Sequence, residues 1–123
     1  MIASESCAFY PVGGEATHEI GPGEMVVIDD HGMRFSQAVP SQGETMCLFE
    51  YIYFARPDSV MSGSALYEAR ERMGRRLAVE HPVEADVVVP VPDSGIPAAH
   101  GFSDVSGIPF HEAMMKSNYA DKQ

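Results

Sequence analysis

Residues 92–95, Pro-Asp-Ser-Gly, combine side chains and backbone that could bind an anion or a metal ion. They follow an apolar run, 86–91, that predicts a strand buried on both faces, as in parallel sheets. A predicted helix, 96–105, begins directly after them, and the first turn of a helix has free backbone N–H groups that attract anions. Asp93 and Ser94 add oxygen atoms for a hard cation or a sugar phosphate. The sequence therefore predicts a phosphate-binding loop in an α/β protein.

Three residues of this loop have possible roles in binding, and Ser94 also has a simpler structural interpretation. Gly95 would let the backbone approach a phosphate closely, because it has no side chain. Asp93 could orient the loop or contact a water of the metal, but it would repel a phosphate directly. Ser94 could face Mg²⁺, whereas Asp and Ser are also favoured as helix caps. The residues alone leave both interpretations of Ser94 open.

The elements that must position this loop fall into two parts. The first forty residues predict short strands joined by Gly-rich turns, with a hairpin turn at 29–32. The predicted strands are 6–12, 16–20, 24–28 and 33–39. Such a piece needs partner elements to cover its faces. A linker at 40–44 follows it.

The second part predicts strands at 47–55, 86–91 and 108–115, with helices between them. The aromatic segment 47–55 is interpreted as a strand buried on both sides. Strand and helix alternate from there onward, and this order predicts a parallel sheet with right-handed crossovers. The fold class is therefore α/β.

The helix predicted at 64–80 has one apolar stripe and one charged face. Ser62 or Ser64 is the candidate cap, and Pro82 is expected to end the helix at His81. The apolar stripe consists of Leu66, Ala69, Met73 and Leu77. The charged face consists of Glu68, Arg70, Glu71, Arg72, Arg75 and Arg76.

Composition limits the classes of function. With 123 residues the chain has room for one modest domain, and its formal net charge of −10 argues against non-specific nucleic-acid binding. Two cysteines do not make a disulfide framework in a chain of this size. We find no signal peptide and no apolar run of about 20 residues that would cross a membrane. A soluble, cytoplasmic protein is expected.

Four segments occur in the same order in one protein family. They are Ile2–Ala8, Gly21–Met25, Cys47–Ser59 and Pro90–Ala99. On these residues the chain resembles a middle portion of amidophosphoribosyltransferase, also called glutamine phosphoribosylpyrophosphate amidotransferase. The resemblance extends to about Tyr119 and therefore covers nearly all of the sequence.

The resemblance implies two domains. Residues 1–40 would be the end of an N-terminal-nucleophile glutaminase domain, which releases ammonia from glutamine. Residues 41–123 would begin a type I phosphoribosyltransferase domain, which uses ammonia to displace pyrophosphate from phosphoribosyl pyrophosphate. The product, phosphoribosylamine, starts de novo purine synthesis. The whole enzyme is expected to be a homo-oligomer.

The resemblance also assigns site residues. The loop Pro92, Asp93, Ser94 and Gly95 would bind pyrophosphate, with Mg²⁺ at Ser94. Lys116 would begin a flexible loop that closes over the substrate, although the family's usual Arg is missing after it; a surface lysine is the alternative. Cys47 would correspond to a ligand of a [4Fe–4S] cluster in one branch of the family. Its alternative is a small buried hydrophobic residue, since a cluster needs four thiolates.

No catalytic residue is assigned within this sequence. The family's glutaminase nucleophile would lie upstream of it, and Cys7 is not that residue. The acidic pair of the phosphoribosyl-binding loop would lie downstream, so the chain alone is expected not to complete a turnover. The alternatives are a non-catalytic remnant that acts as a folding or interaction piece, and a salvage phosphoribosyltransferase. The β-rich first forty residues argue against the salvage enzyme.

Other candidate residues are given structural roles. Arg56 and Asp58 are expected to hold each other or to cap the next helix. The histidines show no metal-ligand spacing, and each is expected on the surface or at an edge. They are His18, His31, His81, His100 and His111.

Overall fold

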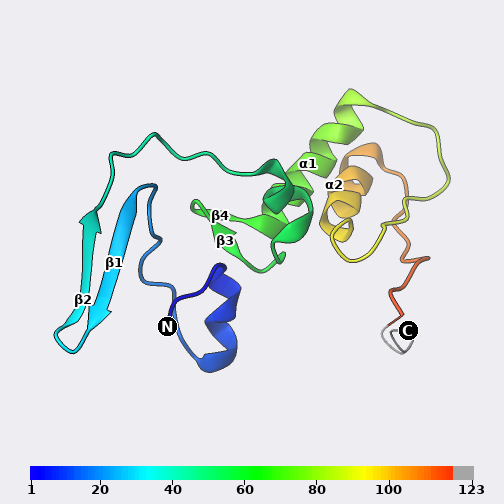
Figure 1. Ribbon diagram of the computed structural model, residues 1–123. Helices are drawn as coiled ribbons and strands as arrows, with labels where there is room; N and C mark the ends of the chain where they lie inside the picture. The colour runs from blue at the N-terminus through cyan, green and yellow to red at the C-terminus, as the bar shows by residue number, and fades with distance from the viewer. Residues whose placement is uncertain (118–123) are drawn as a thin grey trace.

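The β-hairpin and the pair of long helices lie at opposite ends of the molecule (Figure 1). The computed structural model describes residues 1–117. Along the chain the elements are η1 (Ser6–Ala8), η2 (Tyr10–Val12), β1 (Glu24–Asp29), β2 (Gly32–Gln37), η3 (Glu50–Phe54), β3 (Val60–Met61), β4 (Ser64–Ala65), α1 (Leu66–Glu80) and α2 (Ile96–Ser106). This mixture of helix and strand agrees with the predicted α/β class.

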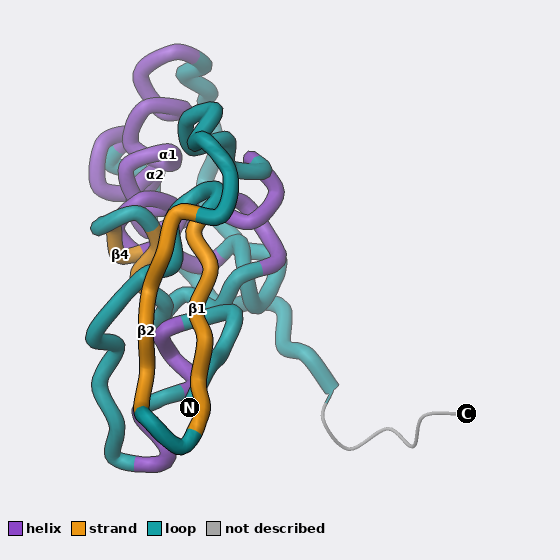
Figure 2. Tube along the Cα trace, turned by 60° about the vertical axis from the view of Figure 1, so that its left-hand side comes forward, coloured by secondary structure: helices purple, strands orange, loops and turns teal. Residues whose placement is uncertain are grey.

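The predicted hairpin is confirmed. β1 and β2 pair antiparallel, with Asp29 opposite Gly32 at the turn. Gly32 has φ +110°, a conformation that favours glycine. Figure 2 shows the two strands side by side along their length.

Two of the predicted strands in the first forty residues are wrong. Residues 6–12 form the 3-10 turns η1 and η2, because Pro11 lies in the first turn of η2 and Gly13 ends it in the left-handed region. Residues 16–20 have no regular structure. Within the described chain β1 and β2 pair only with each other. Residues 16–20 therefore have no neighbouring strand in this part of the chain to pair with.

Both predicted helices are confirmed, and their ends follow local signals. α1 ends at His81, whose φ of −134° lies outside the helical region, as expected for a residue before proline. α2 has Pro97 in its first turn and ends at Gly107, with φ +72°. The predicted cap of α1 is wrong. Its N-cap residue is Ala65, and no side chain caps the helix.

The helices α1 and α2 pack against each other through glycines. A Cβ atom at Gly74 would overlap the carbonyl oxygen of Ala98, and one at Gly101 would overlap the carbonyl oxygen of Glu71. Each helix therefore presents a glycine to the backbone of the other. This contact places the first turn of α2 close to the middle of α1.

The buried face of α1 differs from the predicted stripe. The buried residues are Leu66, Ala69, Arg70, Gly74 and Ala78. Met73 and Leu77 are 38% and 49% exposed, because the small-residue face, rather than the large apolar one, packs on α2. Arg70, predicted on the charged face, is only 2% exposed.

Segment 47–55 was predicted as a buried strand, and this prediction is wrong. Residues 48–54 are helical, and 50–54 form the π-helix η3. Arg70 stabilises this turn: its Nε donates to the carbonyl of Tyr51 at 2.6 Å, and its Nη2 donates to the carbonyl of Ala55 at 2.7 Å. The aromatic residues face outward instead of filling a sheet, with Phe54 65% exposed.

The strands predicted at 86–91 and 108–115 shorten to one parallel bridge between Val88 and Phe110. The Val88 N–H donates to Pro109 at 2.8 Å, and the His111 N–H donates to Val88 at 3.0 Å. The pairing is parallel, as predicted, but Val87 and Val91 are exposed. A strand buried on both faces needs neighbours on both sides. In residues 1–117 the valine run has one neighbour, so burial of both faces is not reached.

The apolar core is small and lies mainly beneath α1. Its members with at most 9% exposure are Cys7, Ala55, Leu66, Ala69, Ala78 and Ile108. Among residues 1–117, no helix has the length and apolar character needed to cross a lipid bilayer.

Candidate functional site

The predicted phosphate-binding loop forms a tight turn directly before α2. The Gly95 N–H donates to the carbonyl of Val91 at 3.1 Å, and the Ile96 N–H donates to the carbonyl of Asp93 at 3.4 Å. A Cβ at Gly95 would lie 2.6 Å from the Val91 carbonyl oxygen, so this position requires glycine. The Pro92–Asp93 peptide bond is cis. Two backbone N–H groups predicted to be free for an anion are therefore already bonded within the turn.

The helix-cap interpretation of Ser94 is not supported by the geometry. The N-cap residue of α2 is Gly95, and no side chain makes a capping hydrogen bond. Ser94 is half-buried and Asp93 is exposed. The hydroxyl of Ser94 therefore makes no capping hydrogen bond to α2, and its role as a binding residue stays a prediction.

Lys116 lies beside this loop, although 22 residues separate it from Ser94 in the sequence. Its Nζ is 3.6 Å from Oδ2 of Asp93, and both side chains are about two-thirds exposed (65% and 67%). An exposed pair of this kind contributes about 0–1 kcal/mol to stability. The structure therefore brings together Pro92, Asp93, Ser94, Gly95 and Lys116. Asn118 and Tyr119, the rest of the predicted closing loop, lie outside the described residues.

The side-chain oxygens of the loop could bind a metal ion that is also bound by the phosphates of a substrate. Asp93 and Ser94 offer one carboxylate and one hydroxyl, and Mg²⁺ commonly takes few protein oxygens together with substrate phosphates and water. In the described part of the chain, no group of three or more His, Cys, Asp or Glu side chains could hold a metal by itself. A metal at Ser94 would therefore need the phosphates of the substrate.

The cysteines of this chain do not form a cluster site. Cys7 is buried and Cys47 is exposed. Cys47 is therefore not the buried apolar residue of the simpler interpretation. A [4Fe–4S] cluster needs four thiolates, and the 123 residues contain two cysteines. Cys47 can supply one ligand at most.

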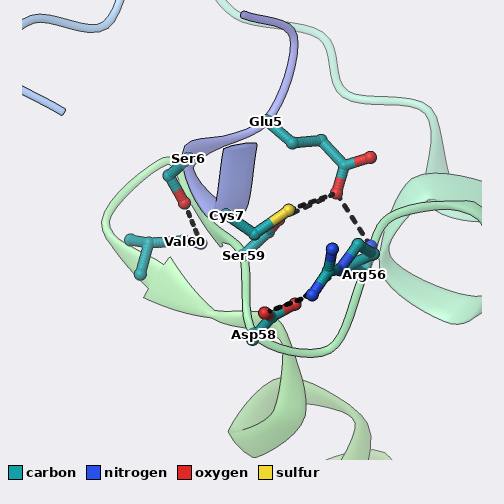
Figure 3. A network of polar contacts seen from close by, with 7 residues as sticks. All are labelled: Glu5, Ser6, Cys7, Arg56, Asp58, Ser59 and Val60. Carbon is teal, nitrogen blue, oxygen red and sulfur yellow. Dashed lines mark hydrogen bonds and ion pairs between the residues drawn. The ribbon is translucent and has the colours of Figure 1, made fainter. Parts of the chain in front are cut away.

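A second polar cluster was not singled out from the sequence. The carboxylate oxygen Oε2 of Glu5 accepts hydrogen bonds from the backbone N–H of Arg56 and from Oγ of Ser59, both at 2.8 Å (Figure 3). The N–H of Arg56 is the main reason that the pKa of Glu5 lies below its ordinary value of 4.5, followed by the Ser59 hydroxyl. Arg56 and Ser59 lie more than fifty residues from Glu5 in the sequence, and no local spacing could indicate these contacts.

The predicted pairing of Arg56 and Asp58 is confirmed. The guanidinium donates to both carboxylate oxygens, Nε to Oδ1 at 3.0 Å and Nη2 to Oδ2 at 2.8 Å. These bonds raise the pKa of Arg56. The pair does not cap α1, which begins after Ala65.

Two of the histidines, His18 and His100, contact aromatic or acidic side chains. His18 lies 2.9 Å from Oε2 of Glu24, with its ring centroid 4.2 Å from that of Phe35. The ring of His100 stacks on Phe110 at 4.0 Å. These positions agree with the edge and surface roles that were predicted.

The sequence is similar to amidophosphoribosyltransferases over nearly its whole length, as the motifs indicated. The protein from Archaeoglobus fulgidus is 47% identical over 99% of this chain and 27% of its own length. Those from Rattus norvegicus and Bacillus subtilis are 45% and 43% identical, with 24% and 26% of their lengths covered. The chain thus spans about a quarter of these relatives. No family model matches the sequence.

Solved structures agree with this similarity. One, described as the allosteric regulatory enzyme of purine biosynthesis, has a TM-score of 0.90 and 44% identity, and it covers 95% of this chain and 25% of its own. A second is glutamine phosphoribosylpyrophosphate amidotransferase from B. subtilis complexed with ADP and GMP, with a TM-score of 0.88 and 42% identity; 97% of this chain and 28% of that chain are covered. The resemblance and the α/β class are confirmed.

Proposed function

We propose that this chain is the part of an amidophosphoribosyltransferase in which the glutaminase portion, residues 1–40, meets the phosphoribosyltransferase portion, residues 41–123. The observation that carries the proposal is the similarity of 43–47% identity along 98–99% of the chain. The turn at Pro92–Gly95 adds support, because it lies directly before α2 with Lys116 beside it. In this proposal the substrates are phosphoribosyl pyrophosphate and glutamine or ammonia.

The proposed reaction makes one bond and breaks another. The nitrogen of ammonia attacks C1 of the ribose, the C1–O bond to pyrophosphate breaks, and the bonding electrons leave with pyrophosphate. The nitrogen then gives up one proton to solvent, which leaves the neutral amine. Groups that stabilise this growing negative charge speed the reaction. When bound, Mg²⁺ would supply positive charge to the leaving pyrophosphate.

The residues of the loop have distinct roles in this proposal. Ser94 would present its hydroxyl oxygen to the metal, and Asp93 would accept a hydrogen bond from a metal-bound water. Gly95 would keep the turn tight enough for the phosphates to approach the backbone. Lys116, which lies beside Asp93, would offer a positive charge to the phosphates once they bind.

The experiment uses the chain itself and Mg²⁺-pyrophosphate as the probe. We expect weak, saturable binding that shifts the amide signals of Ser94 and Gly95 in nuclear magnetic resonance spectra. Ser94→Ala should weaken binding about tenfold, as expected for the loss of a hydrogen bond to a charged ligand. The control is Ser36→Ala, on the exposed face of β2. Binding that is equal in both variants would contradict the role of Ser94.

The competing interpretation is a non-catalytic remnant that acts as a folding or interaction piece. It is favoured by the exposed aromatic side chains of Phe49, Tyr53 and Phe54 around η3, which a partner could cover. An assay with ammonia, phosphoribosyl pyrophosphate and Mg²⁺ separates the two for the isolated chain. Turnover above background would exclude the remnant.

A further inference from the structure

We infer that the carboxylate of Glu5 fastens the glutaminase portion to the transferase portion and so fixes the orientation between them. The inference rests on the proposed function, which assigns residues 1–40 and 41–123 to the two portions. The contacts of Glu5 span 51 residues to Arg56 and 54 residues to Ser59. They join the first turn of the chain to the segment that leads into α1 (Figure 3).

Two neighbouring residues hold both ends of the 56–60 turn. Oε2 of Glu5 accepts from the Arg56 N–H and from the Ser59 hydroxyl, each at 2.8 Å. Oγ of Ser6 accepts from the Val60 N–H at 2.8 Å. Ser59 is fully buried, so water does not compete for that bond.

The bonds to Glu5 are not part of an ion pair. The guanidinium of Arg56 is directed to Asp58, and only its backbone N–H reaches Glu5. The negative charge of Glu5 is therefore held mainly by hydrogen bonds, with a smaller electrostatic contribution from the charge of Arg56. Such hydrogen bonds are stronger to a carboxylate than to a neutral amide. A neutral glutamine at this position should hold the turn less well.

The 56–60 turn is connected to the phosphate-binding loop through the helices α1 and α2. The Leu66 N–H donates to the carbonyl of Ser59 at 3.0 Å, and the Tyr67 N–H donates to the carbonyl of Pro57 at 2.9 Å. These bonds fix the start of α1. The glycines of α1 and α2 then fix α2, whose first turn follows Ser94. None of these contacts to α1 and α2 involves Glu5 itself, so its loss should free the N-terminal turns and leave the loop in place. Glu5 is thus a positioning residue for the two portions, distant from the reacting atoms.

The first test measures amide hydrogen exchange in the complete 123-residue chain. Glu5→Gln should make the Arg56 amide exchange about tenfold faster, with a smaller change at Val60. The control is Glu15→Gln, an exposed residue, which should leave both amides unchanged. If Glu5→Gln fails to fold, Ser59→Ala replaces it, with the same direction of change. Unchanged exchange at Arg56 would overturn the inference.

The second test uses the complete enzyme that carries this segment, and it compares synthesis from glutamine with synthesis from ammonia. Glu5→Gln should lower the glutamine-dependent rate about tenfold, in line with the loss of positioning, and leave the ammonia-dependent rate within about twofold. Glu15→Gln should leave the ratio of the two rates unchanged. An equal loss of both rates, or no loss, would overturn the inference. Absence of any ammonia-dependent synthesis in the unaltered enzyme would instead contradict the proposed function.

Discussion

Arg70 shows how one buried cation can determine a local fold. Its side chain donates to the carbonyls of Glu50 and Tyr51, at the start of η3, and to that of Ala55, directly after its end. Burial lowers the pKa of its guanidinium, and its Nη1 atom has no partner within the described residues. The pattern of charges on α1 predicted a solvated arginine, because periodicity does not reveal a distant set of carbonyl groups.

Replacing Arg70 should destabilise the protein strongly. We expect Arg70→Ala to lower the free energy of unfolding by about 3 kcal/mol, since buried carbonyls lose their donors. Arg72→Ala is the control, because the Arg72 side chain is 60% exposed. Urea unfolding followed by circular dichroism measures both. Equal effects of the two variants would show that Arg70 does not stabilise η3.

Glu5 should make the attachment of the N-terminal turns depend on pH. Hydrogen bonds, first of all the one from the Arg56 N–H, place the pKa of Glu5 in the folded chain below its ordinary value of 4.5. A lowered pKa contributes stability that is present above pH 4.5 and lost as the pH falls through the folded value. The Arg56 amide should therefore lose protection from exchange in this acidic range.

Glu5→Gln provides the comparison for this titration. The variant has no carboxyl group at this position, so its Arg56 exchange, corrected for intrinsic rates, should be flat across the same range. Glu15→Gln should keep the pH dependence of the unaltered chain. A transition that persists in Glu5→Gln would assign it to another acid.

Among the elements, the α1–α2 pair depends most on small residues. Alanine is usually favoured over glycine inside a helix by about 1 kcal/mol. At Gly101 the added methyl group would overlap the Glu71 carbonyl, and overpacking of this kind costs about 1–3 kcal/mol. The cost of this overlap should exceed the gain in helix propensity.

We therefore expect Gly101→Ala to lower the free energy of unfolding by up to about 2 kcal/mol. Gly21→Ala is a matched control, since its Cβ would meet only Oε2 of Glu24, at 3.9 Å. Thermal unfolding compares the two. A more stable Gly101→Ala variant would mean that the helices separate easily to admit the methyl group.

Elements with local signals could be predicted from the sequence, and elements that depend on distant partners could not. Pro82 and Gly107 mark the ends of the helices, and Gly32 marks the hairpin turn, because these residues restrict the backbone around them. Segment 47–55 has the composition of a strand but is helical, since Arg70 binds its carbonyls. The valine run lacks a second neighbour within the described chain.

The candidate site follows the same division. Residues 92–95 are contiguous and could be identified from the order strand, turn and helix. Lys116 was placed at the site only through the resemblance, and the structure adds its contact with Asp93. Glu5 was missed, because hydrogen bonds to Arg56 and Ser59 leave no pattern in the neighbouring sequence.

At the scale of the whole molecule, much apolar surface faces solvent. Phe49, Tyr53 and Phe54 are 62–65% exposed around η3. A hollow of about 770 Å³ separates the N-terminal residues from one face of the hairpin, where Val26 and Phe35 lie. Groups of exposed apolar side chains are typical of an interface.

Local stability should differ between the two ends of the molecule. β1 and β2 pair only with each other in the described chain, and an isolated two-stranded hairpin is marginally stable. The helices α1 and α2 share a close interface. We expect amides of the hairpin to exchange at least about tenfold faster than those in the middle of α1, as measured by hydrogen exchange. Equal protection would indicate that the hairpin is held by contacts with the rest of the chain.

The connection between β2 and η3 has no regular structure from residue 38 to residue 47 (Figure 1). Since Glu5 and Ser6 join the two sides by other bonds, this connection is not the only link between them. A backbone cut within it should leave two pieces that reassociate when mixed. The two pieces would then be held together by non-covalent contacts alone, as in a split protein.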